Sequence, residues 1–95
     1  MDVTIEDNAP AARFEAYEGD DLVGFATYTR KAGVVVYQHT EVEPEYRRQG
    51  IGGALVRAAL DDARQRGLRV RALCPFVSSW MDRHPEYRDL GAQEE

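Results

Sequence analysis

The chain has 95 residues, of which 43% are hydrophobic and 31% charged, and its formal net charge is −5. This length predicts one domain, residues 1–95, with a modest core. The acidic balance argues against general nucleic-acid binding, and no apolar run is long enough to cross a membrane. The chain starts with no signal-peptide pattern, has one cysteine, and shows no zinc-site spacing. We therefore expect a cytoplasmic protein without an internal disulfide or a metal site.

The charges are separated along the chain. Residues 1–29 contain seven acids and one base, whereas residues 47–71 contain seven arginines and two acids. A basic region favours an anionic ligand, and an acidic face favours a cationic one. A solvated surface is the simpler interpretation for most of these charges.

The first half of the chain predicts an antiparallel meander of four strands. Alternating apolar residues indicate a weak edge strand near residues 3–5, then strands over residues 12–18, 22–29 and 34–42, joined by short turns. In the third strand, alternation places two sets of residues on opposite faces: Val23, Phe25 and Thr27 against Leu22, Ala26 and Tyr28.

The second half predicts two helices and one strand. A long helix runs from about Gly50 to Arg66, and a fifth strand over residues 68–73 should lie parallel to strand 34–42, because a helix supplies the crossover. A short C-terminal helix begins at Pro75. The long helix has a core stripe and two exposed ion pairs, namely Ile51, Leu55, Ala58, Ala59 and Ala63, with Arg57–Asp61 and Asp62–Arg66. The fold class is therefore α/β (α+β).

A glycine-rich turn lies between the fourth strand and the long helix. Gly50, Gly52 and Gly53 allow the backbone to approach a ligand closely, and the free N–H groups of a helix start favour a phosphate. Arg47 and Arg48 add positive charge. The turn lacks the Lys-Ser/Thr ending of a P-loop and the full dinucleotide fingerprint. A purely structural turn is the alternative.

The order of residues in this turn resembles the acyl-CoA signature of the GNAT superfamily of N-acetyltransferases. Arg47-Arg48-Gln49-Gly50-Ile51-Gly52 matches the pattern Gln/Arg-x-x-Gly-x-Gly/Ala, and Val42-Glu43-Pro44-Glu45-Tyr46-Arg47 matches the usual lead-in. Three further segments make the chain similar to the minimal, single-domain branch of that superfamily: His39-Thr40-Glu41-Val42, Leu73-Cys74-Pro75-Phe76-Val77 and His84-Pro85-Glu86-Tyr87.

This resemblance implies a truncated GNAT-like fold that binds acetyl-CoA or CoA. The residues expected to hold the cofactor are Val42, Arg47, Arg48, Gln49, Gly50, Ile51, Gly52, Gly53 and Ser79. Larger GNAT domains carry two helices between their first two strands and two more C-terminal strands, and these parts build the acceptor pocket. The present sequence has room for neither, so the resemblance supports cofactor binding better than any particular acceptor.

Acetyl transfer needs a base for the amine and an acid for the departing thiolate. His39 and Glu41 share one strand face, and either could be the base, or Glu41 could orient His39. Cys74, just before a helix start, could be the acid, an acetylated nucleophile or a packing residue. Many GNAT enzymes use a tyrosine acid on the following helix, but the matching positions here hold Trp80 and Met81.

Three hypotheses follow from these residues. The first is an N-acetyltransferase that moves an acetyl group from acetyl-CoA to an amine by a direct ternary-complex mechanism. Its acceptor is unknown, with a basic protein as one candidate, and the chain is expected to be a monomer or a weak dimer. The second is a CoA- or acyl-CoA-binding module with little or no transferase activity. The third, a small interaction domain, leaves the turn motif unexplained.

Overall fold

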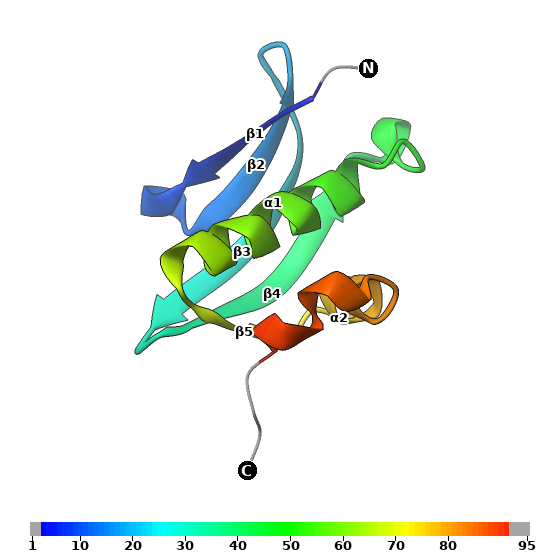
Figure 1. The fold of residues 1–95 in the computed structure, drawn as a ribbon. Coiled ribbons are helices and arrows are strands. Elements are labelled where there is room, and N and C mark those ends of the chain that lie inside the picture. Colours follow the sequence, from blue (N-terminus) through cyan, green and yellow to red (C-terminus); the bar gives the residue numbers. More distant parts are fainter. Residues whose placement is uncertain (1–2, 92–95) are drawn as a thin grey trace.

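The computed structural model describes residues 3–91. Its centre is a five-stranded sheet of order β1-β2-β3-β4-β5, in which only β4 and β5 are parallel (Figure 1). The strands are β1 Thr4–Asn8, β2 Arg13–Glu18, β3 Asp21–Lys31, β4 Val34–Val42 and β5 Arg69–Ala72. The helices are α1 Ile51–Arg66 and α2 Pro75–Asp82, with three 3-10 turns, η1 Ala9–Ala11, η2 Pro44–Tyr46 and η3 Pro85–Leu90. The predicted fold class, meander and parallel fifth strand are confirmed.

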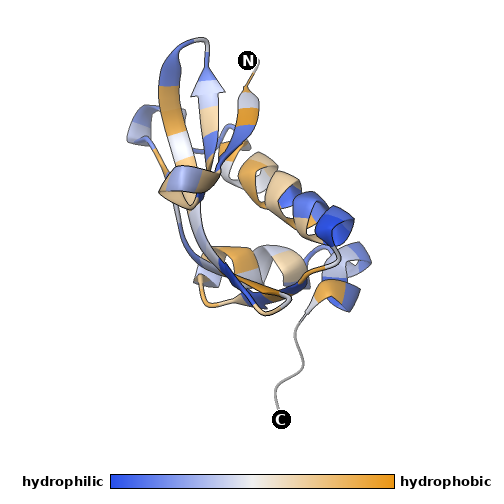
Figure 2. Cartoon of the chain, turned by 90° about the vertical axis from the view of Figure 1, so that its left-hand side faces the viewer, coloured by the Kyte–Doolittle hydropathy of each residue, from blue (hydrophilic) through white to orange (hydrophobic). Residues whose placement is uncertain are grey.

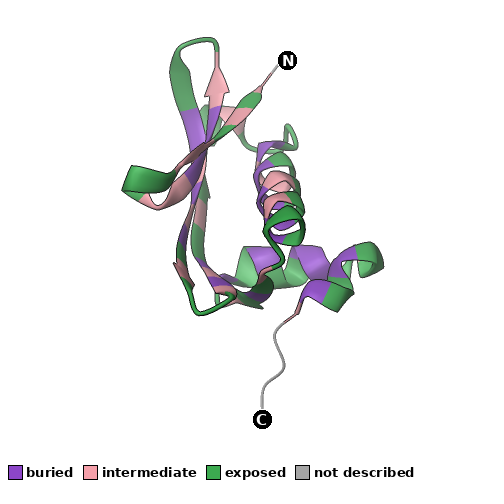
Figure 3. Cartoon of the chain, turned by 60° about the vertical axis from the view of Figure 1, so that its left-hand side comes forward, coloured by how far each residue is buried: buried purple, intermediate pink, exposed green. Residues whose placement is uncertain are grey.

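Both α-helices lie on one side of the sheet. α1 crosses the sheet, and α2 packs beside it at the β4–β5 end (Figure 3). The core between them contains Ile51, Leu55, Ala59 and Ala63 of the predicted stripe, and also Val56 and Leu60, which the stripe omitted. Ala58, the fifth predicted member, is only partly buried and lies outside this core. The other side of the sheet, here called the outer face, is not covered by any element of residues 3–91. β1 and β2 are joined only by η1, so no helix pair intervenes there.

A β-bulge in β3 makes the predicted face assignment of that strand wrong. Tyr17 pairs with Leu22 and Ala16 pairs with Gly24, so Val23 is an extra residue in the ladder. The bulge reverses the alternation at this point. Val23 is therefore buried in the core with Ala26, whereas Phe25 and Thr27 lie on the outer face.

A second bulge, in β4, decides where the candidate catalytic strand end points. Tyr28 pairs with Tyr37 and Thr27 with His39, so Gln38 is the extra residue. Before the bulge, Tyr37 faces the core, where its hydroxyl donates to the carbonyl of Ala59 at 2.7 Å. After the bulge, His39 and Glu41 occupy outer-face positions of β4.

One of the two predicted ion pairs on α1 is present. Arg66 Nε donates to Asp62 at 2.8 Å, as the spacing predicted. The predicted ion pair between Arg57 and Asp61 is wrong. The Tyr87 hydroxyl donates to Asp61 at 2.7 Å and accepts from Arg57 at 3.2 Å, so a buried tyrosine of η3 stands between the two.

A cluster of charges, here called the charge network, joins β1 and β3 to the end of α1. Arg30 donates to Asp7 at 2.8 Å and to Asp62 at 3.2 Å, and Tyr28 also donates to Asp7. Burial alone would raise the pKa of Asp7, but the bonds from Tyr28 and Arg30 lower it below its usual value. Burial and Asp7 raise the pKa of Tyr28 to about 12. Figure 2 shows the hydrophilic last turns of α1 that supply Asp62 and Arg66.

None of the helices within residues 3–91 has both the length and the apolar character that a membrane span requires.

Candidate active site

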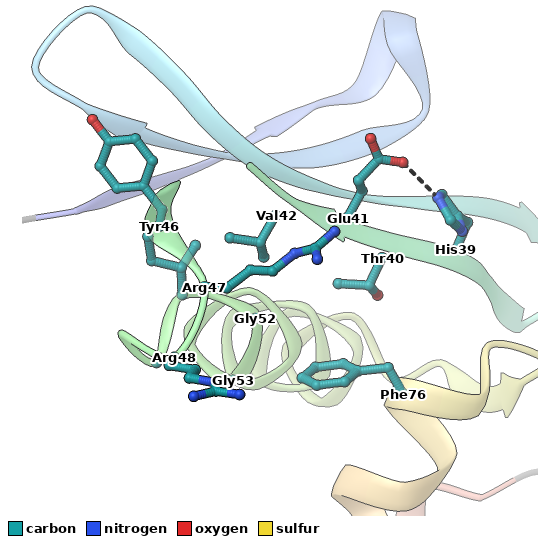
Figure 4. Close-up of a pocket in the computed structure, with 12 residues that line it drawn as sticks. His39, Thr40, Glu41, Val42, Tyr46, Arg47, Arg48, Gly52, Gly53 and Phe76 are labelled. Atoms are coloured by element: carbon teal, nitrogen blue, oxygen red, sulfur yellow. Dashed lines mark hydrogen bonds and ion pairs between the residues drawn. The ribbon is translucent and has the colours of Figure 1, made fainter. Parts of the chain in front are cut away.

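A pocket of ≈ 540 Å³ opens where β4 and β5 separate (Figure 4). The last link between these strands is the carbonyl of Tyr37, which accepts from the N–H groups of both Leu73 and Cys74 at 3.0 Å. Beyond it, β4 continues without a partner strand on that side among residues 3–91. The pocket is lined by β4, η2, the start of α1 and one residue of α2, namely His39, Thr40, Glu41, Val42, Tyr46, Arg47, Arg48, Gly50, Ile51, Gly52, Gly53 and Phe76.

The start of α1 presents free donors to the pocket. The first backbone bond of the helix runs from Ala54 N–H to the carbonyl of Gly50, at 3.0 Å. The N–H groups of Ile51, Gly52 and Gly53 have no partner within residues 3–91, as expected for a first helical turn. Together with the helix dipole, they form a site suited to an anion.

The turn before α1 reaches this geometry through left-handed backbone. Gly50, the N-cap, has φ +80°, and Arg48 has φ +68°. A left-handed conformation is natural for glycine but costs a residue with a side chain about 1–2 kcal/mol. The side chains of Arg47 and Arg48 make no ion pair or hydrogen bond with any described residue. They are therefore available to a bound anion.

Two glycines of the turn also serve packing between the helices. A Cβ atom built on Gly52 would lie 2.8 Å from Phe76 Cζ, and one on Gly53 would lie 3.2 Å from Trp80 Nε1. These glycines let α2 approach the start of α1. Sequence reasoning missed Phe76, which lines the pocket and is 42% exposed. The local pattern gave no signal for it, because adjacent positions of α2, such as Trp80 and Met81, can both be buried.

His39 and Glu41 meet on the outer face at the edge of the pocket. Their side chains are 59% and 56% exposed, and His39 Nε2 lies 3.0 Å from Glu41 Oε1. Because a carboxylate accepts hydrogen bonds, this contact favours a hydrogen on Nε2, which in the neutral imidazole leaves the lone pair on Nδ1. Figure 4 shows both side chains on one side of β4 and Thr40 on the other.

Cys74 is placed differently from the histidine and the glutamate. It is the N-cap of α2, only 4% exposed, and does not line the pocket. Its Sγ lies 3.6 Å from Thr40 Oγ1, and Thr40 does line the pocket. The Cys74 thiol therefore contacts the pocket only through the hydroxyl group of Thr40, among residues 3–91.

Two other predicted residues lie outside the pocket lining. The Gln49 amide donates to the carbonyl of Glu45 at 3.3 Å, which holds the turn together. Ser79 accepts from Arg83 at 2.8 Å on the exposed side of α2. Seven of the nine residues expected to hold the cofactor line the pocket, and all seven belong to β4, the turn or the start of α1.

The surroundings of the pocket are acidic as well as basic. A hydrogen bond from Tyr46 to Glu18 raises the pKa of the Tyr46 hydroxyl and ties η2 to the β2–β3 hairpin. Glu18, like Asp20 and Asp21 of that hairpin, has no ion pair with another described residue. Among residues 3–91 no group of three or more acids, histidines or cysteines could hold a metal ion.

Comparison with known proteins identifies relatives of this arrangement. The family model described as GCN5-related N-acetyl-transferase matches residues 13–90. The protein NATD1 of Bos taurus is 36% identical over 52 residues, which are 55% of this chain and 46% of NATD1. The match thus spans about half the length of this curated relative.

Solved structures show the same fold. The solution structure of a GCN5-like protein from Staphylococcus aureus has a TM-score of 0.74 at 23% identity, and the match covers 97% of this chain and 90% of that one. A GNAT family acetyltransferase from Brucella melitensis, solved in complex with acetyl-CoA, has a TM-score of 0.59 at 26% identity. That match covers 68% of this chain and 48% of the other.

Proposed function

Because the chain belongs to the GCN5-related N-acetyl-transferase family, we propose that it transfers an acetyl group from acetyl-CoA to an amine. One observation carries this proposal. A single pocket joins an anion-binding helix start to an exposed histidine–carboxylate pair. The first can hold the diphosphate of CoA, and the second can accept a proton from an amine. Both partners would then be bound together, as a direct ternary-complex mechanism requires.

The donors at the start of α1 fit a CoA diphosphate. The N–H groups of Ile51, Gly52 and Gly53 would hydrogen-bond the phosphate oxygens, and Arg47 and Arg48 would supply charge. The glycines support this fit less than their number suggests, since the space beside Gly52 and Gly53 is occupied by Phe76 and Trp80. The fit rests on the unpaired N–H groups and arginines.

His39 is proposed as the base. Acetyl-CoA, when bound, supplies an activated acetyl thioester. The free Nδ1 of His39 can take the proton that the amine loses, while Glu41 holds the Nε2 hydrogen and stabilises the imidazolium that forms. The exposure of both side chains leaves an amine free to reach them.

Cys74 is proposed as the proton donor to the departing thiolate, acting through Thr40. Its burial and its absence from the pocket lining disfavour direct attack on the thioester. The thiol can pass a proton to Thr40 Oγ1, which lies 3.6 Å away, while the hydroxyl proton of Thr40 moves on into the pocket. A Cys74→Ala variant that keeps full turnover would make the cysteine a packing residue, and acetylated Cys74 in mass spectra would instead show a covalent route.

A basic protein remains the proposed acceptor. The outer face beside His39 is open, so few groups would fix the orientation of a small free amine. The acids of the neighbouring β2–β3 hairpin that form no ion pair with another described residue, Asp20 and Asp21, would favour a cationic partner that brings its own contacts.

The same openness favours the second candidate function, a CoA-binding module with little transfer. Titration with CoA tests the shared first step, and binding is expected under both proposals. Thiol release from acetyl-CoA is then followed with a panel of small amines, polyamines and lysine-rich peptides. Acceptor-dependent release supports the transferase. If CoA binds but no amine causes thiol release from acetyl-CoA, the result supports the CoA-binding module instead.

A further inference from the structure

The His39 side chain rests on an aromatic ring of the neighbouring strand. On the outer face, His39 pairs with Thr27 in the ladder, and Glu41 pairs with Phe25. The Phe25 ring lies diagonally beside the imidazole, with the ring centroids 6.2 Å apart and the planes inclined by 57°. This separation and tilt fall in the range of attractive aromatic pairs.

A cation from the strand on the other side of β3 also contacts this ring. The guanidinium carbon of Arg13, on β2, lies 4.8 Å from the centroid of Phe25. Three neighbouring strands therefore contribute one row of contacts on the outer face, in which the Phe25 ring contacts both Arg13 and His39. The row exists because the bulge at Gln38 turns His39 to this face.

Arg13 is itself held by a buried carboxylate. Glu15 is 4% exposed and accepts from Arg13 Nε at 2.6 Å, from the Tyr17 hydroxyl at 2.8 Å and from the Asn8 amide at 3.1 Å. Burial would raise the pKa of Glu15, but the bonds from Tyr17, Arg13 and Asn8 lower it instead. The carboxylate is therefore ionised at neutral pH, and its hydrogen bond holds the Arg13 side chain in place at that pH.

We propose that Phe25, backed by Arg13 and Glu15, is a positioning residue that holds the imidazole of His39 in the orientation needed for proton transfer. The inference rests on the transferase function proposed above. An imidazole that is 59% exposed has few other contacts to restrain it. Glu41 fixes one ring nitrogen, and the ring of Phe25 limits rotation about the remaining bonds, so that Nδ1 keeps one direction.

The first test needs no acceptor. Only two histidines occur in the chain, and His84 is stacked on Trp80 at 3.6 Å, so its ring resonances differ strongly from those of His39. In NMR spectra of the wild-type protein we expect cross-peaks between the rings of His39 and Phe25. In Phe25→Leu the His39 resonances should move toward those of a free histidine. Absence of the cross-peaks in the wild type would overturn the inference.

The second test is kinetic and uses an amine that the panel identifies. Phe25→Leu should lower kcat about tenfold, because misorientation of a catalytic group is costly, while KM for acetyl-CoA stays unchanged. Phe25→Tyr, which keeps the ring, should restore turnover, and Arg13→Gln should show a smaller loss. Val36→Ala, a matched truncation elsewhere on the outer face, should have wild-type kcat.

The outcomes separate this inference from the function on which it rests. If the wild-type protein is active and Phe25→Leu has the same kcat, the positioning role alone is overturned. A parallel loss of kcat, acetyl-CoA affinity and thermal stability would make Phe25 a structural residue and also overturn it. Wild-type protein that releases no thiol with any amine would overturn the transferase function itself.

Discussion

The charged side chains at the two ends of α1 differ in whether they are paired. At its C-terminal end, the charge network pairs Arg30 with Asp7 and Asp62, in half-buried positions. At its N-terminal end, Arg47 and Arg48 line an open pocket and pair with no described residue. Paired, half-buried charges hold strands and helix together, whereas unpaired charges beside a helix start remain available to a ligand. We therefore expect substitutions at one end to change stability and those at the other to change binding or turnover.

The largest effect is expected at the pocket. His39→Ala should lower kcat by about 10²–10⁴-fold, because general acid–base groups contribute that much. Affinity for CoA and the melting temperature should stay near those of the wild type, since His39 is exposed. Steady-state kinetics with the best amine of the panel measure the loss. The matched control is His84→Gln, at the other histidine. A His39→Ala variant with wild-type kcat would exclude the histidine as base.

Arg30→Met should lower the free energy of unfolding by about 2 kcal/mol, because it removes hydrogen bonds to two carboxylates. CoA affinity should not change, since the network lies at the far end of α1. Urea denaturation measures the first quantity and calorimetry the second. Lys31→Met, at the exposed neighbouring position, is the matched control and should be neutral. Weakened CoA binding in a folded Arg30→Met variant would contradict the separation of the two ends.

Arg47→Ala and Arg48→Ala should each weaken CoA binding by about 0.2–1 kcal/mol, the usual range for an exposed ion pair. The loss should shrink as salt is added, because screening already weakens the wild-type interaction. Stability should be unaffected. Arg83→Ala removes an exposed arginine of α2 that bonds to Ser79, and it serves as control. Equal CoA affinity in all three variants and the wild type would remove the arginines from the cofactor site.

The smallest expected effect is the contribution of Asp7 to the fall in melting temperature at low pH. The pKa of Asp7 is lower in the folded protein than its ordinary value of 3.8, so its contribution to stability is complete above that value. The contribution is lost as pH falls through the lowered pKa of the folded state. Melting temperatures measured from neutral pH downward should therefore fall less steeply below pH 3.8 for Asp7→Asn than for the wild type. Asp20→Asn, in an exposed turn, should follow the wild-type profile.

Much of the fold could be predicted because its signals are local. Alternating residues indicated the meander, the helical period indicated α1, and the crossover helix required β5 to be parallel to β4. The glycine turn with its two arginines indicated the side of the pocket that is proposed to hold the cofactor, and the family resemblance that it carries is confirmed. The spacing of His39 and Glu41 was enough to place both side chains on one face, where they meet at 3.0 Å.

The sequence by itself determined the order of the elements, the turn that is proposed to bind an anion and the pairing of His39 with Glu41, because each depends on residues a few positions apart. Only the tertiary structure decided which face of the sheet they occupy. That choice depends on the extra residues Val23 and Gln38, and a bulge is set by the partner strand rather than by local alternation. Packing likewise decided that Cys74 is buried behind Thr40, since neighbours distant in sequence control which side chains reach the pocket.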